Sequence, residues 1–224
     1  MVDFQSRDTT YGEPTDEEAR DESPDEGERE TGADEGDRHD DGRGDDTDHQ
    51  GHDHHAHDRS DLGVGILTVS TTRSLDSDPS GDAIAAAVEA AGHRVVTREL
   101  VGDSRDGVEA IVNRLVARDD VDLVITTGGT GVSPDDVTVE AIRPLLEKEL
   151  PGFGEVFRRL SSESIGTRVV GTRTIAGIAD GVPIFALPGS EDAVTLGTEE
   201  IVLPEAGHLV GLATRGRDEE EAHR

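Results

Sequence analysis

Residues 121–138 read VDLVITTGGTGVSPDDVT, which combines a short apolar run with a glycine-rich loop. The run from Val121 to Thr126 is apolar and β-branched, as is typical of a strand buried on both faces. Strands of this kind belong to parallel sheets whose two faces are covered by helices. The glycines that follow allow a tight turn, so the stretch predicts a buried strand that ends in a binding loop.

The segments on either side of this stretch alternate between strand and helix patterns. Short apolar runs predict further strands, at residues 63–70, 94–100, 168–179 and 182–187. Apolar residues at helical spacing predict helices, which should begin at caps Ser80, Thr138 and Ser190 and at Pro204, with another at 106–117. Pro144 should split the helix at Thr138, because proline removes an internal hydrogen bond. The alternation predicts a three-layer α/β/α domain with a mostly parallel sheet.

Ligands of such sheets bind beyond the carboxyl ends of the strands, which here means the loops 70–73, 102–106, 126–136 and 188–192. The loop of Gly128, Gly129, Thr130 and Gly131 should expose backbone N–H groups that favour an anion such as phosphate. A helix beginning at Thr138 would add its dipole. The sequence has no P-loop motif and no complete dinucleotide fingerprint, and a simple tight turn is the alternative interpretation.

Two carboxylates lie in these loops. Asp103 follows the second expected strand, and Asp136 closes the glycine loop. Beside a bound triphosphate, two aspartates would repel the ligand unless Mg²⁺ lay between them, so the pair predicts metal-assisted phosphoryl or nucleotidyl transfer. The alternative is that Asp103 and Asp136 only cap the helices that follow them.

The composition divides the chain into three parts. Residues 1–60 hold 22 acidic residues against 6 arginines, with almost nothing to bury, and we expect them to be a disordered, His-rich tail. Residues 61–214 should form the domain, and residues 215–224 a charged C-terminal tail. The histidines at positions 39–57 lie among aspartates and suit divalent metals, although a solvated linker is the simpler interpretation.

Charge and residue usage exclude several classes of protein. A net charge of −30 argues against nucleic-acid binding, and the lack of cysteine excludes thiol chemistry and disulfides. No apolar run reaches the length of a membrane span, which predicts a cytoplasmic protein without membrane contact. The acidic excess extends into the domain and the chain has one lysine, so we expect adaptation to high salt rather than only an acidic tail.

Four ordered motifs resemble the MoaB/MogA family of molybdenum-cofactor biosynthesis proteins, over about residues 63–212. They are TGGTG at 127–131 followed by Asp136 and Thr138, PGFGE at 151–155, LPGS at 187–190 and DPSG at 78–81. The resemblance implies a three-layer α/β fold that assembles as a homotrimer. It also implies that the protein binds molybdopterin and Mg·ATP, with the pterin phosphate attacking the α-phosphorus of ATP to give adenylated molybdopterin and pyrophosphate.

The resemblance also assigns roles to individual residues. It implies catalysis and Mg²⁺ binding by Asp103 and Asp136. The glycine loop with Thr138 would hold phosphates, and Pro188, Gly189 and Ser190 would form a second wall. Ser70 lies at the end of the first strand, where the family has a binding residue, and Glu155 faces either the site or solvent.

Two other functions remain open at this stage. One is a nucleotide hydrolase resembling the CinA-type proteins, which usually carry a second domain. The other is a molybdopterin-binding homologue without turnover, which would have no need of both aspartates. A downstream metal-insertion protein is the expected partner, and the sequence does not choose between molybdenum and tungsten.

Overall fold

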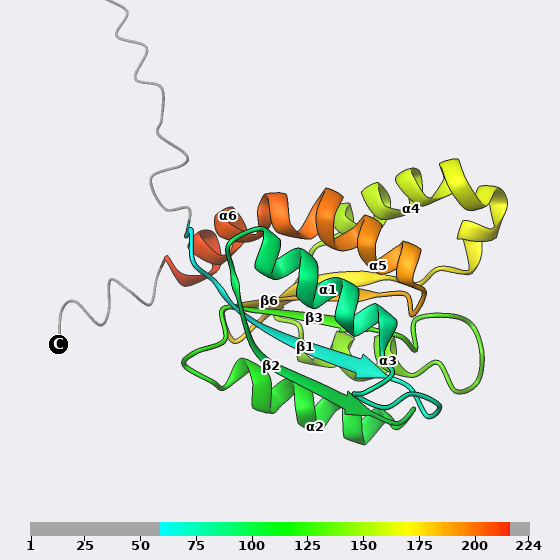
Figure 1. Cartoon of the computed structure of the whole chain (residues 1–224), viewed down its shortest axis with the longest axis horizontal. Coiled ribbons are helices and arrows are strands. Elements are labelled where there is room, and N and C mark those ends of the chain that lie inside the picture. Colours follow the sequence, from blue (N-terminus) through cyan, green and yellow to red (C-terminus); the bar gives the residue numbers. More distant parts are fainter. Residues whose placement is uncertain (1–58, 216–224) are drawn as a thin grey trace, which may run out of the picture. The chain divides into compact units, whose positions relative to one another are not determined.

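A computed structural model describes residues 59–215, and Figure 1 shows their arrangement. The predicted 1–60 tail, its histidines and the predicted 215–224 tail lie outside the described residues, apart from Arg59, Ser60 and Arg215. Within residues 59–215, no helix has the length and apolar character needed to cross a membrane.

The domain is built on one six-stranded sheet with the strand order β2-β1-β3-β6-β5-β4. The strands are β1 (Gly63–Val69), β2 (Arg94–Val101), β3 (Leu123–Thr127), β4 (Lys148–Glu149), β5 (Ile175–Ala179) and β6 (Val182–Leu187). The neighbours β2, β1, β3 and β6 are parallel, whereas β5 pairs antiparallel with both β6 and β4. The mostly parallel sheet predicted from the sequence is therefore confirmed.

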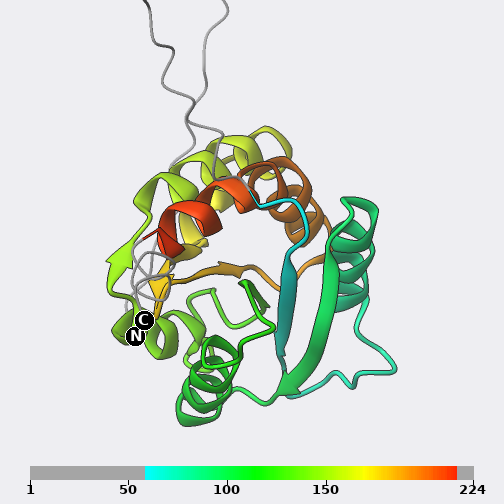
Figure 2. The ribbon, with the colours of Figure 1, turned by 90° about the vertical axis from the view of Figure 1, so that its left-hand side faces the viewer.

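Helices cover both faces of the sheet, which confirms the three layers (Figures 1 and 2). They are α1 (Pro79–Ala90), α2 (Arg105–Val116), α3 (Thr138–Ile142), α4 (Pro151–Ile165), α5 (Glu191–Gly197) and α6 (Leu203–Thr214). The helices α1, α4, α5 and α6 pack on one face around Ile66 and Ile125 of the central strands. On the other face, α2 and α3 pack around Leu67 and Val124. Side chains that alternate along each strand therefore pack into two separate hydrophobic cores, one on each face of the sheet.

One predicted strand boundary is wrong in the C-terminal half. Residues 168–179 do not form one strand: Gly166–Gly171 is a 3₁₀ helix, and β5 begins only at Ile175. A tight turn then joins β5 to β6 as a hairpin, with positive φ at Asp180 (47°) and Gly181 (72°). The sequence reading also missed β4 and α4, which lie between the predicted elements.

Two predicted caps are also corrected. Asp78, not Ser80, is the N-cap of α1, and its carboxylate accepts the N–H of Gly81 at 3.1 Å. Thr138 is the first residue of α3 rather than its cap. Pro144 has the predicted effect, since α3 gives way there to a 3₁₀ turn at Arg143–Leu145.

The last two predicted helices form one continuous helical run. Ser190 is the N-cap of α5, although its side chain makes no capping hydrogen bond. Between α5 and α6 lies a π-helical turn, Thr198–Val202. We attribute the wider turn to Pro204, which cannot donate a hydrogen bond to the turn before it and whose ring crowds that turn.

Candidate functional site

The glycine loop leaves the carboxyl end of β3 in a conformation that requires glycine. Gly128 and Gly129 have φ angles of 93° and 64°. A Cβ atom on Gly128 would lie 2.3 Å from the carbonyl oxygen of Val69. The loop is closed by Thr138, whose Oγ1 donates to the Gly128 carbonyl at 2.8 Å and whose N–H donates to the Gly129 carbonyl at 3.0 Å. Thr138 therefore shapes the loop rather than capping α3.

The segment from Pro188 to Ser190 lies directly against this loop. Thr127 Oγ1 donates to the Pro188 carbonyl at 2.9 Å, and a Cβ on Gly189 would lie 3.2 Å from the Cα of Gly128. Ser190 follows as an exposed residue. Close contact between the two backbones is possible because neither glycine has a side chain. The structure thus brings together the two predicted walls of the site.

A buried carboxylate anchors the second wall. Asp78 is 1% exposed, and it accepts hydrogen bonds from Thr68 Oγ1 at 2.6 Å and from Arg73 at 3.3 Å. Arg73 also donates to the carbonyl of Gly189 at 2.8 Å, and Ser80 Oγ donates to the same carbonyl at 2.9 Å. Asp78 therefore orients an arginine that holds the Gly189 carbonyl in place.

Arg173 is the site residue that the sequence reading missed. It lies just before β5, and its Nε donates to the Gly131 carbonyl at 2.5 Å. Its Nη2 donates to the Asp136 carbonyl at 3.0 Å, and its backbone N–H donates to the Thr130 carbonyl at 3.1 Å. It also forms an ion pair with Glu140 of α3. One side chain thus fixes both ends of the segment from Thr130 to Asp136.

Replacing Arg173 by glutamine should loosen this segment. Loss of several charge-assisted hydrogen bonds should destabilise the domain by about 2 kcal/mol and weaken binding of phosphate-bearing ligands by about tenfold. Urea unfolding and ligand titration would measure the two effects. Arg168→Gln is the matched control, because Arg168 is exposed and pairs with no described residue. If both variants had the same stability and ligand affinity, Arg173 would not hold the segment from Thr130 to Asp136 in place.

The ion pair between Arg173 and Glu140 also predicts a pH dependence. Hydrogen bonding by Arg173 lowers the pKa of Glu140 below its ordinary value. A lowered carboxylate pKa stabilises the fold above the unfolded-state pKa of roughly 4.3, and that stability is lost as pH falls through the lowered value. Glu140→Gln should therefore reduce the free energy of unfolding modestly at pH 7 and by less at pH 3. If the variant lost the same free energy of unfolding at pH 7 and at pH 3, the ionised Glu140 carboxylate would not be the cause.

The two predicted carboxylates lie in different surroundings. Asp136 Oδ2 accepts the N–H of Ser133 at 2.7 Å, so this side chain closes the turn in the glycine loop instead of capping α3. Asp103 is half-buried and makes no hydrogen bond or ion pair with any described residue. Ser104, not Asp103, caps α2, by accepting the N–H of Gly107 at 3.3 Å. The capping alternative is therefore wrong for both aspartates.

The topology places these aspartates on one edge of the sheet. Asp103 follows β2 and Asp136 follows β3, with β1 between the two strands. Their strands are therefore two strand spacings apart, about 10 Å. Within residues 59–215, no group of three or more acidic, His or Cys side chains is arranged to hold a metal ion. A Mg²⁺ ion at this edge would depend on phosphate oxygens and water for its remaining ligands, which is the usual habit of this ion.

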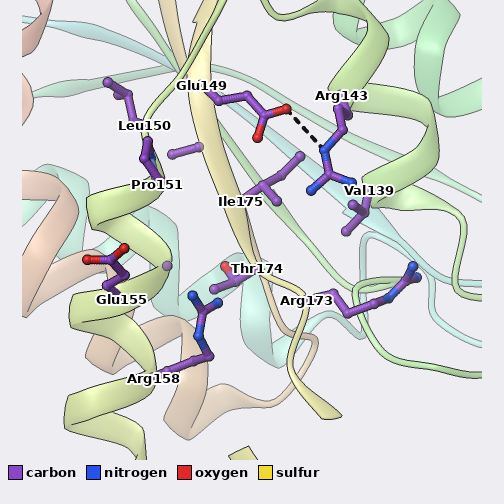
Figure 3. A pocket seen from close by; sticks show the side chains of 12 residues that line it. Val139, Arg143, Glu149, Leu150, Pro151, Glu155, Arg158, Arg173, Thr174 and Ile175 are labelled. Carbon is purple, nitrogen blue, oxygen red and sulfur yellow. Dashed lines mark ion pairs between the residues drawn. The ribbon is translucent and has the colours of Figure 1, made fainter. Parts of the chain in front are cut away.

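The remaining predicted residues divide between this edge and a second cavity. Ser70 directly follows β1, and its Oγ accepts the N–H of Thr72 at 3.2 Å in the turn after the strand. A cavity of about 370 Å³ lies beside Asp136 and is bounded by Arg173. Glu155 lies elsewhere: it is exposed on α4 and borders a different cavity, which Arg173 also lines (Figure 3).

The chain is similar in sequence to proteins of a known family. Residues 65–208 match a family described as probable molybdopterin binding domain. Molybdenum cofactor biosynthesis protein B of Halalkalibacterium halodurans is 44% identical over 146 residues, which are 65% of this chain and 86% of that protein. Its counterpart in Escherichia coli K12 is 43% identical over 142 residues, 63% of this chain and 84% of that protein.

Solved structures agree with this match. The crystal structure of a molybdenum cofactor biosynthesis protein B superposes with a TM-score of 0.68 at 38% identity, covering 69% of this chain and 97% of that one. The tungsten cofactor synthesizing protein MoaB from Pyrococcus furiosus superposes with a TM-score of 0.62 at 37% identity, covering 69% and 98%.

Proposed function

The chain belongs to the MoaB family of molybdopterin-binding domains, and we propose that it transfers AMP from ATP to the terminal phosphate of molybdopterin, with release of pyrophosphate. Its place in molybdenum-cofactor biosynthesis follows from the family. The observation that carries this proposal is a single edge of the sheet where the glycine-rich loop, the opposed Pro188–Ser190 wall and Asp103, a carboxylate that pairs with no described residue, occur together.

The residues of this edge divide the proposed work between them. The N–H groups of the segment from Gly128 to Gly131 bind and orient phosphate oxygens, helped by the positive φ angles of its first two glycines. The wall from Pro188 to Ser190 limits where the ligand lies. Bound Mg²⁺ would neutralise phosphate charge, with Asp103 and Asp136 as its protein ligands.

Catalysis in this proposal consists mostly of positioning. The attacking phosphate oxygen and the leaving pyrophosphate must lie in line across the α-phosphorus, and a rigid loop holds them there. Arg173 and Thr138 supply that rigidity through the five carbonyl groups they bind. We further propose the trimer that the family resemblance implies, which light scattering on the purified chain would test.

Label transfer from ATP tests the chemistry directly. ATP labelled with ³²P at the α-phosphate is incubated with Mg²⁺ and molybdopterin in concentrated KCl. We expect the label to move to the pterin only when protein, pterin and Mg²⁺ are all present. Label released as free AMP without pterin would instead indicate a nucleotide hydrolase, and no release at all with tight pterin binding would indicate a binding protein.

A further inference from the structure

A second cavity on the domain is lined by arginines although the chain as a whole carries a net charge of −30. It has a volume of about 290 Å³ and lies between α3, β4, the start of β5 and the N-terminus of α4. Arg143, Arg158 and Arg173 all border it. Three arginines around one cavity are unexpected on a protein with so large a negative charge.

Two of these arginines are directed into the cavity. Figure 3 shows Arg143 and Arg158 extending their guanidinium groups from opposite walls, whereas Arg173 extends toward the glycine loop. Arg158 forms no ion pair or hydrogen bond with any described residue, and it is only partly exposed. Its position depends on Gly154, because a Cβ there would lie 2.9 Å from Nη1 of Arg158. The backbone of α4 is thus shaped to let this guanidinium lie across it.

The carboxylates that border the cavity do not neutralise it. Glu149 is paired with Arg143, with Nε and Oε1 3.2 Å apart. That contact uses Nε and leaves the terminal nitrogens of Arg143 available. Glu155 is exposed, and its carboxylate is drawn on the side of α4 away from Arg143 (Figure 3). The lining holds three arginines and two glutamates, so it carries a formal excess of one positive charge.

The start of α4 adds to this preference for an anion. The helix has 15 residues, no side-chain cap and no acidic residue in its first turn. The N–H of Gly152 makes no hydrogen bond with a described residue, and a side chain there would meet nothing within 4 Å. The start of the helix borders the cavity through Pro151 and Gly154, so the partial positive charge of the helix N-terminus lies beside the cavity.

We propose that this cavity is a second oxyanion site, which binds a phosphate group between Arg143, Arg158 and the first turn of α4. Two guanidinium groups beside the positive end of a helix suit the charge of a phosphate. The volume exceeds that of a lone phosphate, so a phosphate monoester on a larger molecule is the favoured source. This site is separate from the residues proposed to carry out adenylyl transfer, and phosphate can bind there without turnover.

Residue-resolved phosphate titration tests the proposal on the full chain. Inorganic phosphate is added to ¹⁵N-labelled protein at constant ionic strength, and the amide resonances of Gly152, Phe153 and Gly154 are followed. We expect saturable shifts at these three residues. Arg158→Gln should weaken this binding about tenfold, and Arg158→Lys should restore part of it.

Arg159→Gln is the matched control, because it removes the same charge from the next, exposed position of α4. It should change the affinity at Gly152 less than twofold. Equal weakening by both glutamine variants, or no shift at residues 152–154, would overturn the proposal. A parallel titration with methyl phosphate identifies the source, since tighter binding than inorganic phosphate indicates a monoester. The amide resonances of the glycine loop are followed separately. This test therefore remains valid even if the protein does not transfer AMP.

Discussion

Gly128→Ala should destabilise the domain by about 2–4 kcal/mol and abolish phosphate binding at the glycine loop. The new methyl group would lie 2.3 Å from the carbonyl oxygen of Val69, which belongs to the backbone, so no flexible side chain can move aside. Alanine also disfavours the φ of 93° found at this position. The loop must therefore move, and its N–H groups move with it.

Urea unfolding and phosphate titration measure the two effects of Gly128→Ala. Gly171→Ala serves as the control, because a Cβ at Gly171 would meet nothing within 4 Å and its φ is not in the left-handed region. That variant should stay within about 0.5 kcal/mol of the parent and keep its ligand affinity. Normal phosphate binding by Gly128→Ala would show that the loop is not the anion site.

Asp103→Asn should reduce adenylyl transfer by at least about a hundredfold while leaving stability almost unchanged. The expected loss comes from removing a charge that holds Mg²⁺ against the substrate phosphates. Stability should not change, because Asp103 pairs with no described residue and Ser104 supplies the cap of α2. Pyrophosphate release and urea unfolding separate these two expectations.

A neighbouring aspartate provides the control for this variant. Asp106 is exposed in the first turn of α2, and Asp106→Asn removes the same charge from the same loop region. Its effect on turnover should be less than about threefold, and it should cost only a few tenths of a kcal/mol through the helix dipole. If both variants slowed the reaction equally, Asp103 would have only a general electrostatic effect.

The sequence was sufficient to predict the edge of the sheet that carries the site. Parallel strands were visible as apolar runs, and the carboxyl ends of such strands meet at one edge, which placed Gly128 and Gly189 together. What local patterns could not supply was the direction of hydrogen bonds, so Thr138 was assigned to a helix cap although it donates to the Gly128 carbonyl.

Arg173 was missed because its role depends on contacts distant in the sequence. It lies 42 residues from Gly131, and only the antiparallel register of β5 against β6 brings it to the glycine loop. The helix α4 left a clearer signal. Phe153, Phe157 and Leu160 follow helical spacing, and all three pack against the core, but the glycines of the PGFGE motif concealed the helix start.

Pyrophosphate release from Mg·ATP, measured with and without molybdopterin in concentrated KCl, tests the central claim most directly. The proposed transfer predicts release that depends on the pterin, with one pyrophosphate for each pterin adenylated, and a loss of orders of magnitude in Asp136→Asn. Tight pterin binding without pyrophosphate from the parent protein would contradict it. The chain would then be a molybdopterin-binding member of its family rather than an adenylyltransferase.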